Sequence, residues 1–517
     1  MSLKPSPLPS WRLAVLAGFV WLALAPATQA QTLIRDTEIE GTLRAYSEPI
    51  FTAAGLNAPD VTVQVVADRS LNAFVTNGQN VFLHTGLIMR AETPNQLKGV
   101  IAHEAGHIAG GHLARSGEAM QAAMTPAYVS IALGLIAIAA GAADAGSALI
   151  ASSQQFALLS FLRFSQVQES AADQAAVTYL NRLGQSSMGL LEFFENFQYM
   201  EVMSEARREP WFRSHPLSTD RIEALRRRAE ASPFRDVEDS PEARERFAMM
   251  RAKIQGFLYP AQQTFLRYPP TDRSLPARYA RAIAAFRAPD LTTAVRETRG
   301  LIEEHPENPY FQELLGQIYF ENGRVAESIE PNRRAVALAP GQPLLQINLA
   351  RSLIAEEDPK GWAEAEQLLR AALRSEPQNA FAWRQLATLY DQRGEGGLAR
   401  LAGAEEAYSV GDIVRAHQFA TFAQEQLSRD TPQWRRASDI ALITEPEAQK
   451  RMRREQREDR RRIAFAAEPI ATRSALSAAM AGTPAAAQAA IEAAHAEVHG
   501  HDHGHDHGHG HGRAHRH

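Results

Sequence analysis

The 517-residue chain contains no cysteine, and this absence excludes several kinds of chemistry. It leaves no disulfide framework, no thiolate metal site and no cysteine nucleophile. A strong charge of one sign is also missing, because the formal net charge is only -5, which argues against bulk nucleic-acid binding. The apolar content of 45% is ordinary for a globular protein, and the length predicts two or three domains.

Long apolar runs are scarce as well. The first run, Leu13–Ala25, follows a positively charged start and is short for a membrane span. Small residues at Thr28–Ala30 match what a signal peptidase reads. The sequence therefore predicts a signal peptide over residues 1–30, cleaved after Ala30, and export of the mature chain. An uncleaved membrane anchor is the alternative.

The most specific feature that is present is the HExxH run His103-Glu104-Ala105-Gly106-His107. On a helix, His103 and His107 lie one turn apart on the same face, where both can bind one Zn²⁺ while Glu104 takes a proton from the attacking water. Thr93-Pro94-Asn95-Gln96 supplies a helix N-cap, a proline at the first helical position and a Gln that can close a capping box. The competing interpretation is a buried helix with two satisfied histidines.

A third ligand is needed to complete such a site. His112 is poorly placed, because the HExxHxxGxxH pattern puts its histidine at position 113, which is Leu113, and position 112 points away from the ligand face. The better candidate is Glu169 in a predicted helix. Asp173, one turn later, can hydrogen-bond a ligand histidine and fix its tautomer. A solvated helix face is the alternative for this Glu/Asp pair.

Three segments together resemble the gluzincin metallopeptidases that include HtpX and the CAAX prenyl proteases: His103–His107, Glu169–Asp173 and Ser214–Ile222. The resemblance implies His103, His107 and Glu169 as zinc ligands, Glu104 as general base and Asp173 as an orienting residue or proton donor. Within this family, the BepA-like periplasmic protease–chaperones also carry a tetratricopeptide tail. In that branch a histidine matching His215 can approach the zinc as a fourth ligand and hold the enzyme silent.

Residues 119–162 form a second apolar region, in which Asp144 is the only charge between Glu118 and Arg163. HtpX-like relatives cross the membrane here, whereas the BepA-like branch has helices that pack on the catalytic domain or touch the membrane surface. The abundance of Ala and Gly favours the second interpretation. Both remain open from the sequence.

Secondary structure is expected to be mainly helical. Residues 31–60 read as helix, Val61–Val66 as a strand, and Asn77-Gly78 as a hairpin turn between two β-rich runs. Such a small sheet beside the zinc helix can bind substrate backbone as an added strand.

Internal repeats begin near residue 276. Small and large residues recur at a spacing of 34 to 37 in four segments: Tyr279–Ile283, Leu315–Tyr319, Leu349–Leu353 and Leu386–Tyr390. This period is typical of tetratricopeptide repeats, which pair antiparallel helices and form a groove for protein segments. We expect about four units, the last irregular around Gly394–Gly411. Unrelated helical hairpins are the less economical alternative.

The end of the chain differs in composition. Residues 441–494 contain the basic stretch Lys450–Arg462, expected as a solvated helix, and an Ala-rich linker. Residues 495–517 hold ten of the seventeen histidines and are expected to be disordered, with some capacity to collect zinc.

The sequence thus predicts a mainly α protein. An α+β zincin-like peptidase domain with a small sheet (31–269) precedes an α-helical tetratricopeptide solenoid (276–440). The resemblance implies a periplasmic zinc endopeptidase that acts on misfolded or stalled outer-membrane proteins, with one Zn²⁺ per subunit. Its repeats would contact clients or the assembly machinery. We also expect a peripheral membrane contact. The alternatives are a chaperone or adaptor with a largely silent zinc site, and a zinc-storage protein built around the tail.

Overall fold

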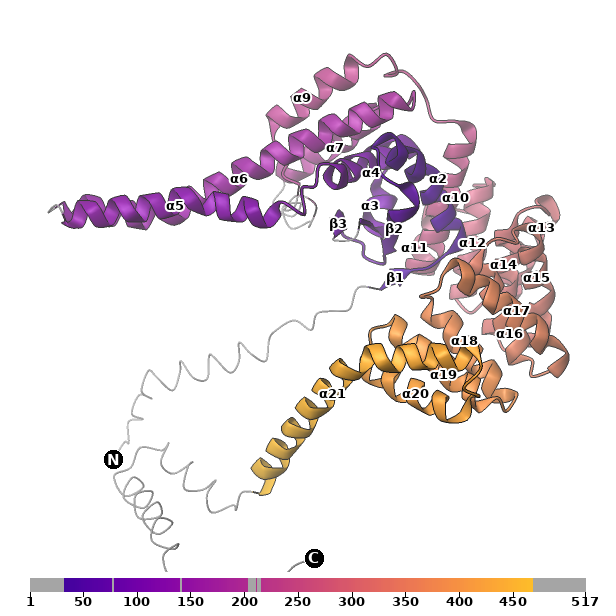
Figure 1. Cartoon of the computed structure of the whole chain (residues 1–517). Helices are drawn as coiled ribbons and strands as arrows, with labels where there is room; N and C mark the ends of the chain where they lie inside the picture. Colours follow the sequence, from indigo (N-terminus) through magenta and orange to yellow (C-terminus); the bar gives the residue numbers. More distant parts are fainter. Residues whose placement is uncertain (1–31, 77–78, 140–141, 203–210, 212–214, 468–517) are drawn as a thin grey trace, which may run out of the picture. The chain divides into compact units, whose positions relative to one another are not determined.

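The computed structural model describes residues 32–76, 79–139, 142–202, 211 and 215–467. The expected signal peptide, the Asn77-Gly78 turn and the His-rich tail lie outside these residues. The chain divides into two compact units, the first ending at Glu376 and the second beginning at Pro377. Figure 1 shows the elements in chain order.

A four-stranded sheet of order β1-β2-β4-β3 lies near the start of the first unit. Its strands are β1 (Leu33–Ile34), β2 (Thr62–Val66), β3 (Ala73–Thr76) and β4 (Asn80–His84). β2 and β4 run parallel, and the other two pairs are antiparallel. The prediction of helix throughout residues 31–60 is wrong at β1, because the main chain there pairs with β2, a partner about thirty residues away.

Helix α2 (Thr37–Ala53) follows β1 and begins where the Asp36 carboxylate accepts hydrogen bonds from the amides of Glu38 and Ile39. Its apolar face joins the core that the sheet forms with α3 (Thr85–Arg90) and α4 (Pro94–Ala109).

Helix α4 begins at the predicted cap, since Thr93 Oγ1 accepts a hydrogen bond of 3.2 Å from the Gln96 amide. The Gln96 side chain reaches the amide of Glu92 instead of that of Thr93, so the capping box is shifted by one residue.

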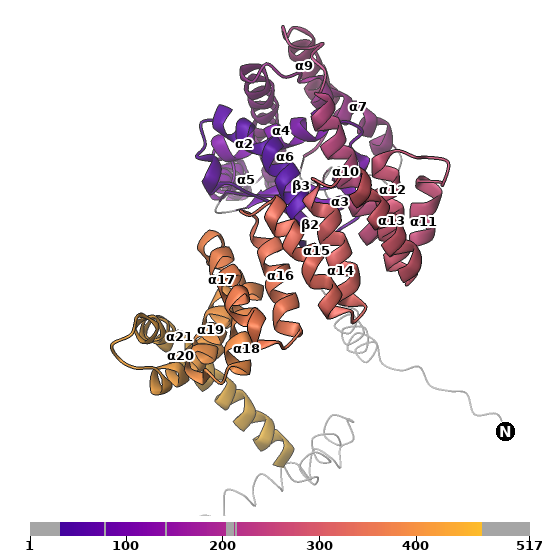
Figure 2. The same cartoon turned by 90° about the vertical axis from the view of Figure 1, so that its right-hand side faces the viewer.

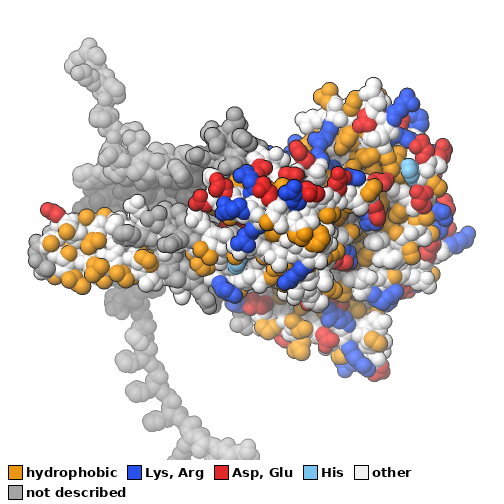
Figure 3. All heavy atoms as spheres, turned by 90° about the horizontal axis from the view of Figure 1, so that it is seen from above, with side chains coloured by type: hydrophobic (Ala, Val, Ile, Leu, Met, Phe, Trp, Pro, Cys, Tyr) orange, Lys and Arg blue, Asp and Glu red, His pale blue; other side chains and the backbone are white. Residues whose placement is uncertain are grey.

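A long antiparallel hairpin leaves this core, made of α5 (Ser116–Ala139) and α6 (Ala143–Arg182) (Figure 1). Figure 3 shows apolar side chains on its described surface. They include Tyr128, Val129, Leu133, Leu135 and Ile136, each more than half exposed. Within the described ranges, no helix combines the length and the apolarity needed to cross a membrane.

Four more helices follow in the first unit: α7 (Met188–Val202), α9 (Thr219–Glu230), α10 (Pro241–Leu258) and α11 (Ala261–Arg267). Helix α10 belongs to two cores. Phe247, Met250 and Ile254 pack with the sheet, whereas Met249 and Ala252 pack with the helices that follow.

Paired helices make up the rest of the described chain. The first unit contains α12/α13 (Leu275–Arg287, Leu291–Glu304), α14/α15 (Pro309–Glu321, Val325–Leu338) and α16/α17 (Pro343–Ala355, Pro359–Ser375). Figure 2 shows α14, α15 and α16 side by side.

The second unit contains α18/α19 (Ala380–Gln392, Gly396–Ser409) and α20/α21 (Ile413–Gln426, Pro432–Ala467). The region Gly394–Gly411, expected to be irregular, contains the regular helix α19, and a further pair follows it. The predicted fold class, a helical protein with a small sheet and repeats, is confirmed.

Candidate metal centre

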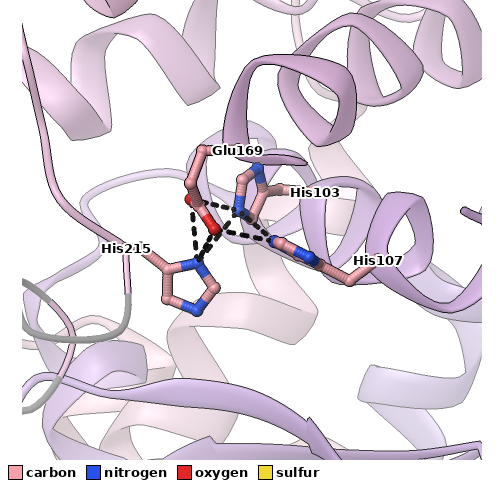
Figure 4. Close-up of side chains that lie close together, drawn as sticks. All are labelled: His103, His107, Glu169 and His215. Atoms are coloured by element: carbon pink, nitrogen blue, oxygen red, sulfur yellow. Dashed lines mark hydrogen bonds and ion pairs between the residues drawn. The ribbon is translucent and has the colours of Figure 1, made fainter. Parts of the chain in front are cut away.

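Four buried side chains from three segments bring one ligand atom each to a common point. They are His103 and His107 from α4, Glu169 from α6 and His215 from the loop before α9 (Figure 4). The ligand atoms all lie within 4.8 Å of one another. His103 Nε2 is 3.1 Å from His107 Nε2 and 3.3 Å from His215 Nδ1. The Glu169 oxygens are 3.0 to 3.5 Å from the three histidine nitrogens.

The close crossing of α4 and α6 makes this convergence geometrically feasible. Gly106, inside the HExxH run, faces the Ala172 main chain, where a Cβ on residue 106 would lie 3.0 Å from the Ala172 Cα. Because neither residue has a bulky side chain, the two helices approach closely enough for Glu169 to meet His103 and His107.

Asp173 lies behind the first histidine, with Oδ1 2.9 Å from His103 Nδ1. Arg221 from α9 donates to both Asp173 oxygens, at 2.5 and 2.9 Å, and its Nη1 is 2.9 Å from Glu169 Oε2. Burial alone would raise the pKa of Asp173, but the Arg221 guanidinium and His103 hold it below its usual value. Arg221 therefore keeps Asp173 ionised, and its contacts fix the orientation of both carboxylates.

Glu104 lies beside the four ligand atoms with its side chain fully buried. Neither of its oxygens has a hydrogen-bond partner among the described residues, and Oε1 is 3.6 Å from His215 Nε2. Burial raises the pKa of Glu104, while His107 and His103 oppose that rise. A buried acceptor of this kind suits a water molecule or a substrate group that enters the centre.

His215 is held by the residue four positions before it. The Trp211 ring stacks on the His215 ring with 4.3 Å between centroids, and the His215 amide donates to the Trp211 carbonyl at 2.7 Å. The Trp211 amide in turn donates to the Leu71 carbonyl, which precedes β3. Trp211 is thereby tied to the segment before β3, and His215 is directed at the other three candidate ligands.

His112 makes a contact that sequence reasoning missed. It does not join the four ligand atoms, in line with its rejection as a ligand, but its Nδ1 lies 2.9 Å from the Nδ1 of His107. Burial and the neighbouring His107 lower the pKa of His112 to about 4, so its ring is neutral near pH 7. His112 can therefore orient His107 from the side opposite the ligand atoms.

The roles of Arg221 and Trp211 were also missed. Arg221 stands in the quoted Ser214–Ile222 motif, but nothing in a sequence pattern marks an arginine as buried. In the sequence, Trp211 is one of six tryptophans, and no motif distinguishes it from the others.

Comparison with known proteins agrees with this geometry. Residues 38–229 match Peptidase family M48, and residues 277–343 match a tetratricopeptide repeat. The beta-barrel assembly-enhancing protease of Yersinia pestis is 26% identical over 359 residues, which cover 68% of this chain and 72% of that protein.

Two further relatives extend the pattern. The putative beta-barrel assembly-enhancing protease of Vibrio cholerae is 24% identical over 421 residues, covering 76% of this chain and 81% of that protein. Metalloprotease LoiP of Escherichia coli is 31% identical over 182 residues, covering 34% and 66%. The chain is therefore a metalloprotease whose residues 38–229 form a Peptidase family M48 domain and whose later helices include tetratricopeptide repeats.

Proposed function

We propose that the chain is a zinc endopeptidase with His103, His107 and Glu169 as ligands and His215 as a fourth. The observation that carries this proposal is the convergence of four ligand atoms beside the buried Glu104. Zinc bonds of about 2.0–2.1 Å in a tetrahedron would separate neighbouring ligand atoms by roughly 3.3 Å. Five of the six pairs of these residues have separations of 3.0 to 3.5 Å, close to that value.

The residues around the ligands support a hydrolytic mechanism. A zinc ion held by these residues would supply Lewis acidity for polarising a scissile carbonyl and for making water more acidic. Glu104 takes the proton of the attacking water and returns it to the leaving amine. Asp173 fixes the ring of His103 through Nδ1, and Arg221 holds Asp173 and Glu169 in place.

His215 closes the position that a catalytic zinc needs for water or substrate, so the described state is the restrained one. Displacement of His215 from that position would open it. Exchange of His215 for Ala should therefore raise proteolysis, including self-cleavage. A variant that binds zinc but is inactive would instead make His215 a substrate-orienting group.

The wider role follows from the named relatives. We propose that the protein works in the periplasm on misfolded or stalled outer-membrane proteins, and that the repeats contact clients or the assembly machinery. The exposed apolar side chains of the α5–α6 hairpin suit a peripheral membrane contact. The proposal includes a domain organisation of five parts. They are a signal peptide (1–30), the peptidase domain (31–269), the repeat domain (276–440), a charged helix and linker (441–494) and a disordered tail (495–517).

A rival function is a chaperone or adaptor with a silent metal site, which the closed His215 position favours. Cleavage of an unfolded protein by the wild-type chain and by Glu104→Gln separates the two. The protease proposal predicts that Glu104→Gln retains zinc and loses at least a hundredfold in rate. Equal activity of the two proteins, or tight zinc binding unchanged in His107→Ala, would contradict it.

A further inference from the structure

A cavity of about 270 Å³ lies in the first unit, away from the metal ligands. Its walls come from the segment leading into α2, from α10, and from the repeat helices α14, α15 and α16. The lining is partly apolar, with Ile34, Phe257 and Phe320, and partly charged, with Lys253, Glu313 and Arg351.

A buried charged cluster lies beside this cavity and contributes Asp36, Lys253 and Glu313 to its lining. The Lys253 ammonium lies 2.7 Å from Asp36, 3.3 Å from Glu38 and 3.5 Å from Glu313. Glu38 also accepts a hydrogen bond of 2.9 Å from the buried Tyr279 hydroxyl. One buried ammonium therefore faces three carboxylates, and a second cationic group would improve the balance.

Glu313 lines the cavity and is the member of this cluster with an incompletely paired carboxylate. Its side chain is one-tenth exposed, and Oε1 accepts a hydrogen bond of 3.1 Å from Asn348. Its Oε2 accepts no hydrogen bond among the described residues and has only the 3.5 Å ion pair with Lys253. Burial raises the pKa of Glu313 to about 7, and Lys253 limits that rise. Glu313 is therefore an incompletely satisfied buried acceptor.

The two arginines of the cavity differ in what they can do. Arg35 is committed to Glu40 and Glu376, at 2.7 and 2.8 Å. Arg351 stacks on the Phe320 ring at 4.0 Å and forms no ion pair with any described residue. Its guanidinium is available to donate to a peptide carbonyl oxygen.

We propose that this cavity binds a lysine side chain of an extended protein segment. The lysine ammonium meets the Glu313 carboxylate, its aliphatic stem lies along Phe257 and Ile34, and Arg351 donates to the main chain of the same segment. A metal ion is the poorer occupant, because the His103 cluster is the one group in the described chain that gathers ligand atoms closely enough. The site is independent of peptide cleavage.

The test uses the full chain with Glu104→Gln, so that peptides stay intact. Fluorescence anisotropy would compare an apolar peptide that has one central lysine with the same peptide acetylated at that lysine. We expect acetylation to weaken binding at least tenfold, because it removes the charge that Glu313 recognises. Glu313→Gln should weaken the lysine peptide to a similar degree and remove the difference between the two peptides.

The exposed Glu303 on α13 provides the matched control, and Glu303→Gln should bind like the parent. Thermal unfolding checks that the Glu313 variant is folded, and Arg351→Gln gives a second variant that should weaken both peptides equally. Equal binding of the two peptides, no binding of either, or equally tight binding of free lysine amide would overturn the proposal. Stronger binding of a peptide with glutamate in place of lysine would also overturn it.

Discussion

Two buried charged clusters in the first unit have the same formal composition and different geometries. The metal centre contains three carboxylates (Glu104, Glu169, Asp173) and one guanidinium (Arg221), and the second cluster contains three carboxylates (Asp36, Glu38, Glu313) and one ammonium (Lys253). Metal binding requires that the histidines of the metal centre are neutral. Each cluster then has a formal charge of -2.

The place of the cation distinguishes the two clusters. Arg221 lies behind Asp173 and beside Glu169, so the ligand atoms of the metal centre converge on a point that a divalent ion can occupy. Lys253 lies at the point where its carboxylates converge, so no metal can take that place. The position of one basic side chain thus decides whether an acidic cluster can bind a metal ion or has part of its negative charge neutralised by that side chain.

The largest expected effect comes from removing the guanidinium of the metal centre. Arg221→Gln leaves Asp173 and Glu169 buried with less compensation, and we expect a loss of about 3–5 kcal/mol in the free energy of unfolding of the metal-free protein. Zinc affinity should fall about 10- to 100-fold. Urea denaturation and zinc titration measure the two effects. Arg227→Gln, at an exposed position of the same helix, should change neither, and an unaffected Arg221 variant would refute the role given to it.

Removal of the ammonium should have a similar but pH-dependent effect. Lys253→Met removes the ammonium that lowers the pKa values of Glu38 and Glu313, so these pKa values rise and the folded protein binds more protons than the unfolded one. We expect the variant to lose about 3 kcal/mol in the free energy of unfolding at pH 7, and this loss should become smaller towards pH 5. Urea denaturation at both pH values tests this, with the exposed Lys360→Met as control. A loss that is independent of pH would mean that packing, not charge, is responsible.

The smallest expected effect is the contribution of Glu313 to the pH dependence of the parent protein. Its pKa is raised from 4.5 to about 7 by burial, while Lys253 from α10 lowers it, and Asp36, which caps α2, and Glu38 in α2 raise it. The folded state therefore retains a proton that the unfolded state releases between these values. The corresponding stability is complete below pH 4.5 and lost as the pH rises through 7, at no more than about 1.4 kcal/mol per pH unit.

Glu313→Gln should remove this slope. Urea denaturation of the parent protein and of Glu313→Gln at pH 5, 6, 7 and 8 gives two curves of unfolding free energy against pH. Their difference is the contribution of Glu313, because all other groups are shared. Parallel curves would show that Glu313 is ionised throughout this range.

Local features of the fold were largely predictable. Thr93 and Pro94 specify the start of α4, and the i, i+4 spacing of His103 and His107 places both on one face, since both effects depend on neighbouring residues alone. The helix pairs follow from a period of 34 to 37 residues for the same reason. Strand β1 was not predictable, because only its pairing with β2 makes it a strand.

The sequence by itself determined the metal chemistry and the repeat architecture. The HExxH motif depends only on the spacing of residues within one helix, and the repeat period depends only on the spacing of neighbouring helices. Only the tertiary structure decided that Arg221 clamps Asp173 and Glu169, that Trp211 holds His215, and that Lys253 faces three carboxylates from α2 and α14. These groups are far apart along the chain. Their burial and charge balance depend on how distant helices pack, and the repeat period indicates only which neighbouring helices form pairs.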